Sequence, residues 1–308
     1  MQVLEADTGG ITENEARLIE LIVSGAREDK EHKTAPAKKD DESRSIQFGE
    51  WIQERLEQGD TLKEVPESLA LKPRLQTPML PFMLSWENRA VQGVTFPKLY
   101  KLLRSYFGGD LLLIPLKESW LILVSEALLN DLREESEEGA DTERDLLSAL
   151  CQGLYELISN EWVGGGCHLS VHELITGDRD IAGAALSLQE TLRIGHLFHV
   201  AEHIHLPWEL RLERLVCSIP DEERGRFLAE MGGAAGIFSD EEMLTTLETF
   251  FQMDCNVSET AKRLYIHRNT LMYRIDKIKQ ETGLDVRTFR DAVLMNLQLL
   301  LYKVTKKA

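Results

Sequence analysis

The chain has 308 residues, more than the roughly 150 typical of one domain, so its length predicts two or more domains. Hydrophobic residues make up 43% and charged residues 28%, a balance that excludes collagen-like and wholly disordered chains. The longest apolar runs, such as Leu111–Leu116, are far shorter than the roughly 20 residues that span a bilayer. We therefore expect no contact with a membrane.

Charge is distributed unevenly along the sequence. The formal net charge of −17 seen over the whole chain would argue against a nucleic-acid partner. Residues 254–308, however, hold 11 Lys and Arg against 6 Asp and Glu, a net of +5, so the preceding 253 residues carry −22. Because DNA repels the acidic part and attracts the basic part, the C-terminal region is the candidate nucleic-acid surface.

Cysteine usage and the first residues indicate the compartment. The four cysteines include no C-x-x-C pair, which favours separate reduced thiols over a disulfide framework or a zinc ribbon. Residues 1–20 are acidic and lack the basic and apolar regions of a secretory signal. These features predict a cytoplasmic protein.

Residues 1–79 are predicted to form a helical N-terminal segment. Thr12–Glu15 has the pattern of a capping box, and the helix that it begins ends near Gly25. Residues 27–45 contain no large aliphatic side chain and are predicted to be a solvated linker. A second amphipathic helix follows and stops at Gly59; its apolar positions are Phe48, Trp51, Ile52 and Leu56.

Residues 80–200 change to alternating strand and helix patterns. The predicted elements are a strand at Phe82–Val91, a helix at Pro97–Phe107, a hairpin of Asp110–Leu116 and Trp120–Ser125, a helix at Thr142–Trp162, a strand at Cys167–Val171 and a helix at Ile181–Arg193. This βαββαβ order is that of ferredoxin-like folds. The middle domain is therefore predicted to be α+β.

Residues 201–308 are predicted to be helical, and residues 256–283 within them have a helix-turn-helix pattern. Asn256 caps a short helix, and the small side chain of Ala261 lets a second helix cross closely. A new helix begins near Arg268, with His267 at its cap. With about 100° per residue, Leu271, Ile275 and Ile278 share a core stripe.

The opposite face of this second helix is polar. Asn269, Tyr273 and Gln280 lie opposite the core stripe, as a helix in the major groove requires. Asp276 also points outward, where it would repel phosphate unless it pairs with Lys279 or Gln280.

The first turn of a recognition helix contacts base edges, and here it is His267–Thr270. Arg268 can contact guanine and Asn269 adenine through two hydrogen bonds each, worth ~1–3 kcal/mol of discrimination. Thr270, Arg274 and Lys277 suit contacts to phosphate, which position the protein without specifying sequence. The predicted DNA-binding residues are His267, Arg268, Asn269, Thr270, Tyr273, Arg274 and Lys277.

The string His267-Arg-Asn-Thr-Leu-x-Tyr-Arg274, within Met243–Tyr302, resembles the C-terminal helix-turn-helix of the PucR/CdaR family of bacterial transcription regulators. The βαββαβ pattern is similar, more weakly, to the degenerate GGDEF-like domain that these regulators carry. Its hairpin tip is Lys117–Ser119 where a working cyclase has its acidic signature, so the resemblance implies no catalysis. Residues 1–79 do not resemble the diacid-recognition domain of some of these regulators, which leaves open whether a small-molecule effector binds.

Two alternatives compete with DNA binding. His199, Glu202 and His203 satisfy the H-x-x-E-H pattern of zinc peptidases, with His196 and His205 nearby, if they lie on one helix. The Phe48 and Trp51 stripe could instead make the chain an interaction module that does not bind DNA.

The fold class predicted is α+β multidomain: a helical segment at 1–79, a ferredoxin-like or GGDEF-like domain at 80–200, and a helical connector with a helix-turn-helix domain at 201–308. We expect a cytoplasmic, non-enzymatic regulator that binds double-stranded DNA as a homodimer and needs neither metal nor cofactor. Pairing is expected because one recognition helix covers only a few base pairs.

Overall fold

The structure is a computed structural model that describes residues 35–307 except 70–71, 76, 88–93, 110, 129, 131–141, 163–165, 200 and 231–233. The predicted capping box at Thr12–Glu15 and its helix lie outside the described residues. Across the described part of the chain, no helix has both the length and the apolar character needed to cross a membrane.

One antiparallel sheet organises the middle of the chain. It contains β1 (Met79–Trp86), β2 (Leu111–Pro115), β3 (Ser119–Ser125) and β4 (Cys167–Val171), in the order β2-β3-β1-β4. All three neighbouring pairs are antiparallel, and β2 and β3 form the predicted hairpin. With α3 (Phe96–Phe107) between β1 and β2, and α5 (Glu143–Glu161) between β3 and β4, this is the predicted split βαβ arrangement.

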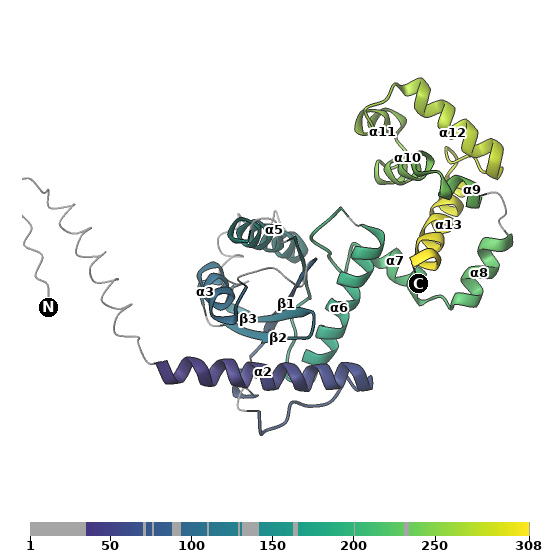
Figure 1. Cartoon of the computed structure of the whole chain (residues 1–308). Helices are drawn as coiled ribbons and strands as arrows, with labels where there is room; N and C mark the ends of the chain where they lie inside the picture. Colours follow the sequence, from purple (N-terminus) through teal and green to yellow (C-terminus); the bar gives the residue numbers. More distant parts are fainter. Residues whose placement is uncertain are drawn as a thin grey trace, which may run out of the picture.

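Helices cover both faces of this sheet. Successive side chains of a strand point to opposite faces, so Leu80 and Phe82 of β1 pack towards α3 and α5, whereas Met83 packs towards α2 (Ala35–Gln58) and α6 (Asp180–Phe198). Figure 1 shows α2 running beneath the sheet, opposite α3 and α5. Burial on both faces explains why the central strand is apolar almost throughout.

Local signals set the ends of the covering helices. At the start of α5, Thr142 and Asp145 form a reciprocal capping box, in which each side chain accepts a hydrogen bond from the other residue's backbone N–H. Gly108 ends α3 in the left-handed conformation, with φ of 67°. Both boundaries agree with the sequence prediction to within a residue.

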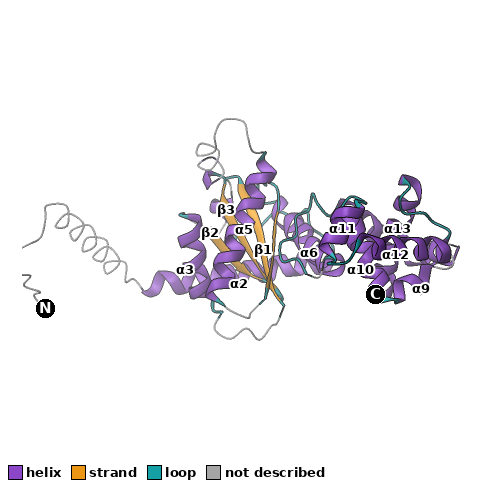
Figure 2. Cartoon of the chain, turned by 90° about the horizontal axis from the view of Figure 1, so that it is seen from above, coloured by secondary structure: helices purple, strands orange, loops and turns teal. Residues whose placement is uncertain are grey.

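The chain after residue 200 is helical in its described elements, as predicted. They are α7 (Arg211–Ser218), α8 (Asp221–Glu230), α9 (Ala234–Ser239), α10 (Glu241–Gln252), α11 (Val257–Arg263), α12 (Arg268–Thr282) and α13 (Phe289–Lys307). Ile194 and Phe198 of α6 pack with Leu300 and Val304 of α13, which joins these helices to the sheet domain. The result is an elongated molecule with α9–α13 on the side of α6 away from the strands (Figure 2).

Two sequence predictions need correction. The linker predicted at 27–45 is helical from Ala35 onward. The N-terminal half of α2 is strongly polar and lacks the apolar spacing that indicates a helix, so the sequence pattern showed only the amphipathic C-terminal half. The first strand, predicted at Phe82–Val91, spans Met79–Trp86 and so begins three residues earlier, with Pro81 inside it; positions 88–91 of the prediction lie outside the described residues. Proline fits there because β4 pairs with β1 only from Phe82 to Trp86. Pro81 C=O still accepts from His172 N–H at 2.8 Å, but no ladder bond on that side requires a Pro81 N–H.

The Phe48 stripe of α2 faces inward. Phe48 and Ile52 are fully buried against the sheet, and the Trp51 ring stacks on that of Phe48 with centroids 5.9 Å apart. The interaction-module hypothesis required this stripe on the surface, so the structure contradicts its premise.

Candidate nucleic-acid interface

The first helix of the predicted helix-turn-helix is α11. The Asn256 side chain accepts hydrogen bonds from the N–H groups of Ser258 and Glu259, so it caps the helix as predicted. Ala261 is buried at the crossing with α12. A larger side chain at this position would force the two helices apart.

The turn between α11 and α12 depends on one strained residue. Tyr265 has a φ of 55°, a left-handed backbone conformation that residues other than glycine rarely adopt. The reversal lets Ile266 N–H donate to Ala261 C=O at 3.0 Å and aims the chain into α12. Nδ1 of His267 then accepts from Asn269 N–H at 3.2 Å and caps α12, which confirms the predicted cap.

The inner side of α12 is the apolar seam that the helical spacing predicted. Leu271, Ile275 and Ile278 are each at most 1% exposed and pack with Phe250 and Met295. Burying a side chain of this size contributes about 1.5–3 kcal/mol, so three of them fix which face of α12 points outward.

The outer side of α12 carries most of the predicted contact residues. Arg268, Asn269 and Thr270 are exposed in the first turn, and Tyr273 follows one turn later with 70% of its surface exposed. Among the described residues, no acidic group forms an ion pair with Arg268. The structure therefore brings a free guanidinium, an amide, a hydroxyl and a phenol onto one surface.

Arg274 is the predicted site residue that the structure places elsewhere. Its guanidinium donates to Thr246 Oγ1 at 3.0 Å and pairs with Glu242, both on α10, and its side chain is only 13% exposed. Arg274 therefore joins α12 to α10. The sequence could not indicate this because the partners lie about thirty positions away.

Lys277 lies at the border of the surface. Its ammonium group is 3.8 Å from Asp240, the cap of α10, and 3.9 Å from Glu281. These are long, half-exposed pairs that contribute little to stability, so the side chain can exchange them for another anion at small cost.

Asp276 finds a different partner from those the sequence offered. Its carboxylate pairs with Arg287 at 3.1 Å, while Lys279 pairs with Asp285 at 2.9 Å. Hydrogen bonds from Arg287 and Lys279 hold the pKa of Asp285 well below its usual range. The turn after Gly283 brings Arg287 back beside α12, a tertiary contact that helical spacing does not reveal.

Sequence reasoning missed residues on the α11 side of the surface. Tyr265 is 96% exposed at the turn, and Lys262 and Arg263 are exposed at the end of α11. The motif Lys-Arg-Leu-Tyr that precedes Ile266 contains both a basic pair and an aromatic residue, which is the signal that could have located them.

The H-x-x-E-H pattern does not form a helical metal site. Because α6 ends at Phe198, His199 and His203 lie beyond it and not on consecutive helical turns, so the premise of the zinc-peptidase hypothesis is wrong. His199 lies 3.3 Å from Glu213, whose hydrogen bond raises the pKa of His199. His203 points away, towards Glu87.

Comparison with known proteins agrees with this geometry. Residues 243–301 match the model of the PucR C-terminal helix-turn-helix domain. The purine catabolism regulatory protein of Bacillus subtilis (strain 168) is 28% identical over 127 residues, which are 41% of this chain and 24% of that protein. The carbohydrate diacid regulator of Escherichia coli (strain K12) is 28% identical over 134 residues, 43% of this chain and 35% of that protein. The chain thus spans well under two thirds of these relatives.

One solved structure can also be aligned with the structure of this chain. It is the regulator of polyketide synthase expression from Bifidobacterium adolescentis, with 19% sequence identity and a TM-score of 0.36. The overlap covers 82% of this chain and 91% of that one.

Proposed function

We propose that this chain, whose residues 243–301 are a PucR C-terminal helix-turn-helix domain, is a transcription regulator that places α12 in the major groove of DNA. The observation that carries the proposal is the division of α12 into a buried seam and an exposed polar first turn. Major-groove insertion needs a helix that is packed on one side and uncovered on the other.

Base recognition is assigned to the first turn of α12. Arg268 and Asn269 have the paired donors and acceptors that fit guanine and adenine. His267 uses Nδ1 for the cap, so its neutral ring carries the proton on Nε2, where it can donate to DNA. Tyr273 extends the same face by one turn.

Phosphate contacts are assigned to residues on both sides of that turn. Thr270 and Lys277 keep the role that the sequence predicted, and Lys262, Arg263 and Tyr265 are added because the first helix of such motifs crosses the DNA backbone. Arg274 is left out of this set, since its contacts with α10 make it a positioning residue.

The rest of the molecule supports this function through charge and pairing. DNA repels the residues before position 254, which carry a net charge of −22, so the chain is expected to approach DNA with α12 foremost. We further propose a cytoplasmic homodimer, so that two copies of α12 reach successive turns of a palindromic site, and a non-catalytic GGDEF-like role for the sheet domain. Equilibrium sedimentation that finds only monomers at high concentration would contradict the dimer.

The test is selection of bound DNA from a random pool by the purified chain, followed by titration of the enriched site. Arg268→Ala is expected to lose ~1–3 kcal/mol of discrimination between that site and random DNA. Lys277→Ala is expected to weaken binding to both DNAs equally and to lower the salt slope by ~1. Arg226→Ala on α8 is the matched control, because its exposed guanidinium already pairs with Glu223.

No enrichment of any sequence would remove sequence-specific DNA binding from consideration. Identical behaviour of Arg268→Ala and Lys277→Ala on cognate and random DNA would instead show that the two roles are wrongly assigned.

A further inference from the structure

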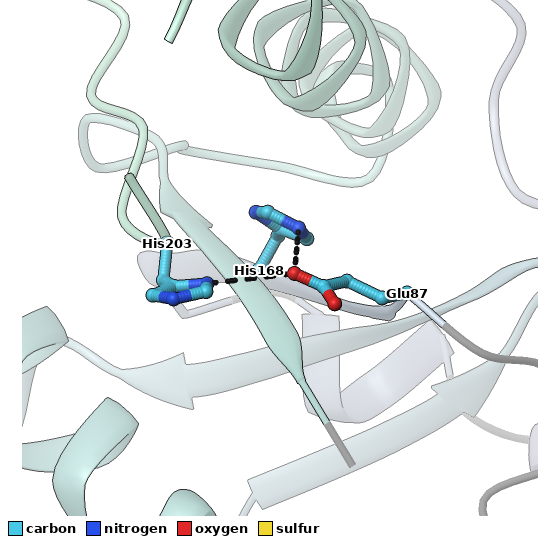
Figure 3. Close-up of side chains that lie close together, drawn as sticks. All are labelled: Glu87, His168 and His203. Carbon is cyan, nitrogen blue, oxygen red and sulfur yellow. Dashed lines mark ion pairs between the residues drawn. The ribbon is translucent and has the colours of Figure 1, made fainter. Parts of the chain in front are cut away.

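A group of titratable side chains lies at the boundary between the sheet and the connection from α6 to α7. Glu87 directly follows β1, His168 is on β4, and His203 is in the connection. One ligand atom from each lies within 4.8 Å of the other two. Figure 3 shows the Glu87 carboxylate facing both imidazole rings.

The backbone holds these three residues in place. Leu169 N–H donates to His203 C=O at 2.8 Å and His205 N–H donates to Leu169 C=O at 2.9 Å, so residues 203–205 run parallel to β4. Glu87 N–H donates to Gly166 C=O at 3.0 Å, just beyond the paired span of β1 and β4. Three segments far apart in sequence are thereby fixed side by side.

Two glycines leave the space that the group occupies. A Cβ added to Gly166 would lie 2.5 Å from a carboxylate oxygen of Glu87, and one added to Gly195 of α6 would lie 2.2 Å from the His205 ring. Both distances are shorter than van der Waals contact allows, so a side chain at either glycine would displace part of the group.

The distances fit a transition-metal ion. Zinc binds nitrogen and oxygen at about 2.0–2.2 Å, which separates neighbouring ligand atoms of a tetrahedral site by roughly 3.3–3.5 Å. His168 Nε2 is 3.3 Å and His203 Nδ1 is 3.8 Å from the same Glu87 oxygen. Because all three ligand atoms lie within 4.8 Å of one another, relative shifts of at most about 1.5 Å would complete three of four tetrahedral positions.

Both ligand nitrogens face the Glu87 carboxylate without a well-aligned hydrogen bond. Within the described residues, His168 Nε2 and His203 Nδ1 are buried atoms that lie at ion-pair distance from Glu87 but have no partner with good hydrogen-bond geometry. An unsatisfied buried polar atom is costly, about 1–3 kcal/mol, and calls for an explanation. A shared cation between the two nitrogens and the carboxylate would satisfy all three groups.

Neighbouring rings orient the two histidines. His168 Nδ1 lies 3.2 Å from His205 Nε2, so that donation from Nδ1 leaves the Nε2 lone pair of His168 directed at Glu87. Tyr155 of α5 stacks on His203 with centroids 5.1 Å apart and fixes that ring.

We propose that Glu87, His168 and His203 bind one divalent transition-metal ion of the zinc class, with water as the fourth ligand. Two imidazoles and a carboxylate are a ligand set that zinc accepts in proteins. The half-exposed side chains of Glu87 and His203 give the ion a path from solvent. The site uses His203 but neither His199 nor Glu202 of the H-x-x-E-H pattern.

A bound ion would link two residues of the sheet region, Glu87 and His168, to His203 in the connection that leads to the helix-turn-helix. Residues 203–205 precede α7, which packs with α6 and α13 in the core that joins the two parts of the molecule. Because the ion binds only the folded arrangement, it stabilises this junction by an amount that grows with metal concentration. The proposal is independent of DNA binding.

Zinc titration of the chelator-treated full-length chain tests the proposal. The wild type is expected to bind one ion per chain, to show the intense visible bands of four-coordinate Co²⁺ when cobalt replaces zinc, and to gain thermal stability on binding. Glu87→Gln and His203→Ala should each weaken zinc binding at least tenfold and abolish the gain in Tm. These two residues are chosen over buried His168 because their replacement leaves the core intact.

His172→Ala and Glu173→Gln are the matched controls, since they change the same residue types directly after β4, outside the group. Both should bind zinc as the wild type does, and circular dichroism should confirm that all four variants fold. Wild-type affinity in Glu87→Gln and His203→Ala, or an octahedral cobalt spectrum, would overturn the proposal, as would the failure of the wild type to bind zinc saturably.

Discussion

The helix-turn-helix and the histidine group differ in how their chemistry is encoded. The proposed DNA-contact surface of α12 comes from one short run of sequence. The helix that buries Leu271 on one side exposes His267–Thr270 and Tyr273 on the other. The histidine group combines Glu87, His168 and His203, which only the pairing of β1 with β4 and of β4 with the connection brings together. The local sequence of one helix therefore determines the surface of α12, whereas contacts between distant segments determine the histidine group.

The two regions also have separate cores. Leu271, Ile275 and Ile278 belong to a cluster made by α9–α13, whereas the sheet has its own clusters on each face. Among the described residues, a cluster centred on the packing of α6 and α7 with α13 connects them. We therefore expect the helix-turn-helix and the sheet domain to lose structure separately.

Ile275→Ala is expected to have the largest effect and can break this comparison. Removing a fully buried side chain costs about 2–5 kcal/mol, which should unfold the C-terminal helices early. All five tryptophans lie between residues 51 and 208, so their fluorescence reports the sheet domain and its connection alone. Urea unfolding should show the helical circular dichroism falling before the tryptophan signal changes. Coincident transitions would show that the molecule unfolds as one unit.

Gly195→Ala tests the packing of His205, the ring that lies against His168 of the histidine group. Its Cβ would lie 2.2 Å from the His205 ring, so the ring must move, at an expected cost of about 1–3 kcal/mol. Gly183→Ala in the same helix is the control: nothing lies within 4 Å of its Cβ, and the better helix former should add about 0.5–1 kcal/mol. Urea unfolding followed by tryptophan fluorescence measures both. Equal stabilisation by the two substitutions would contradict the close contact at His205.

The sequence predicted what neighbouring residues determine. The hairpin of β2 and β3, the cap of α12 at His267 and the seam of Leu271 and Ile278 all follow from spacing, turn residues and capping chemistry, and each is present. The predicted βαββαβ succession is also present, and the sheet order β2-β3-β1-β4 is compatible with it, because a crossover helix and a hairpin leave few ways to arrange four strands.

The side-chain partners that the sequence did not predict depend on contacts between distant segments. The bond of Arg274 to Thr246 and the pair of Asp276 with Arg287 need the packed arrangement of α10, α12 and the turn before α13. The H-x-x-E-H pattern forms no helical site for the same reason, since α6 ends at Phe198 and leaves both His199 and His203 beyond the helix. His203 found its partners in the sheet instead.

Arg274→Ala sharpens the distinction between positioning and contact residues. Loss of its bonds to Thr246 and Glu242 should destabilise the C-terminal helices by about 1–2 kcal/mol, while discrimination between cognate and random DNA stays unchanged. Arg268→Ala should do the reverse, because exposed substitutions usually alter stability by less than about 0.5 kcal/mol. Circular dichroism in urea and fluorescence anisotropy measure the two properties. Normal stability with weaker binding to all DNA would return Arg274 to the phosphate-contact role predicted from the sequence.

Asp276→Asn is expected to have the smallest effect and tests how a negative charge on the outer face of α12 changes the affinity for DNA. Removing this half-exposed charge from the outer face of α12 lowers repulsion of phosphate and leaves Arg287 more available, at a cost to stability of less than about 1 kcal/mol. Affinity for cognate and random DNA should rise equally, by roughly two- to fivefold at about 0.15 M salt, and less at higher salt. Anisotropy titrations over a salt series measure this, with Glu222→Gln on α8 as a control for the same charge change at a remote exposed site. Weaker binding confined to the cognate site would instead mean that Asp276 accepts a hydrogen bond from a base, as a carboxylate can from cytosine, and that base recognition extends beyond the first turn of α12.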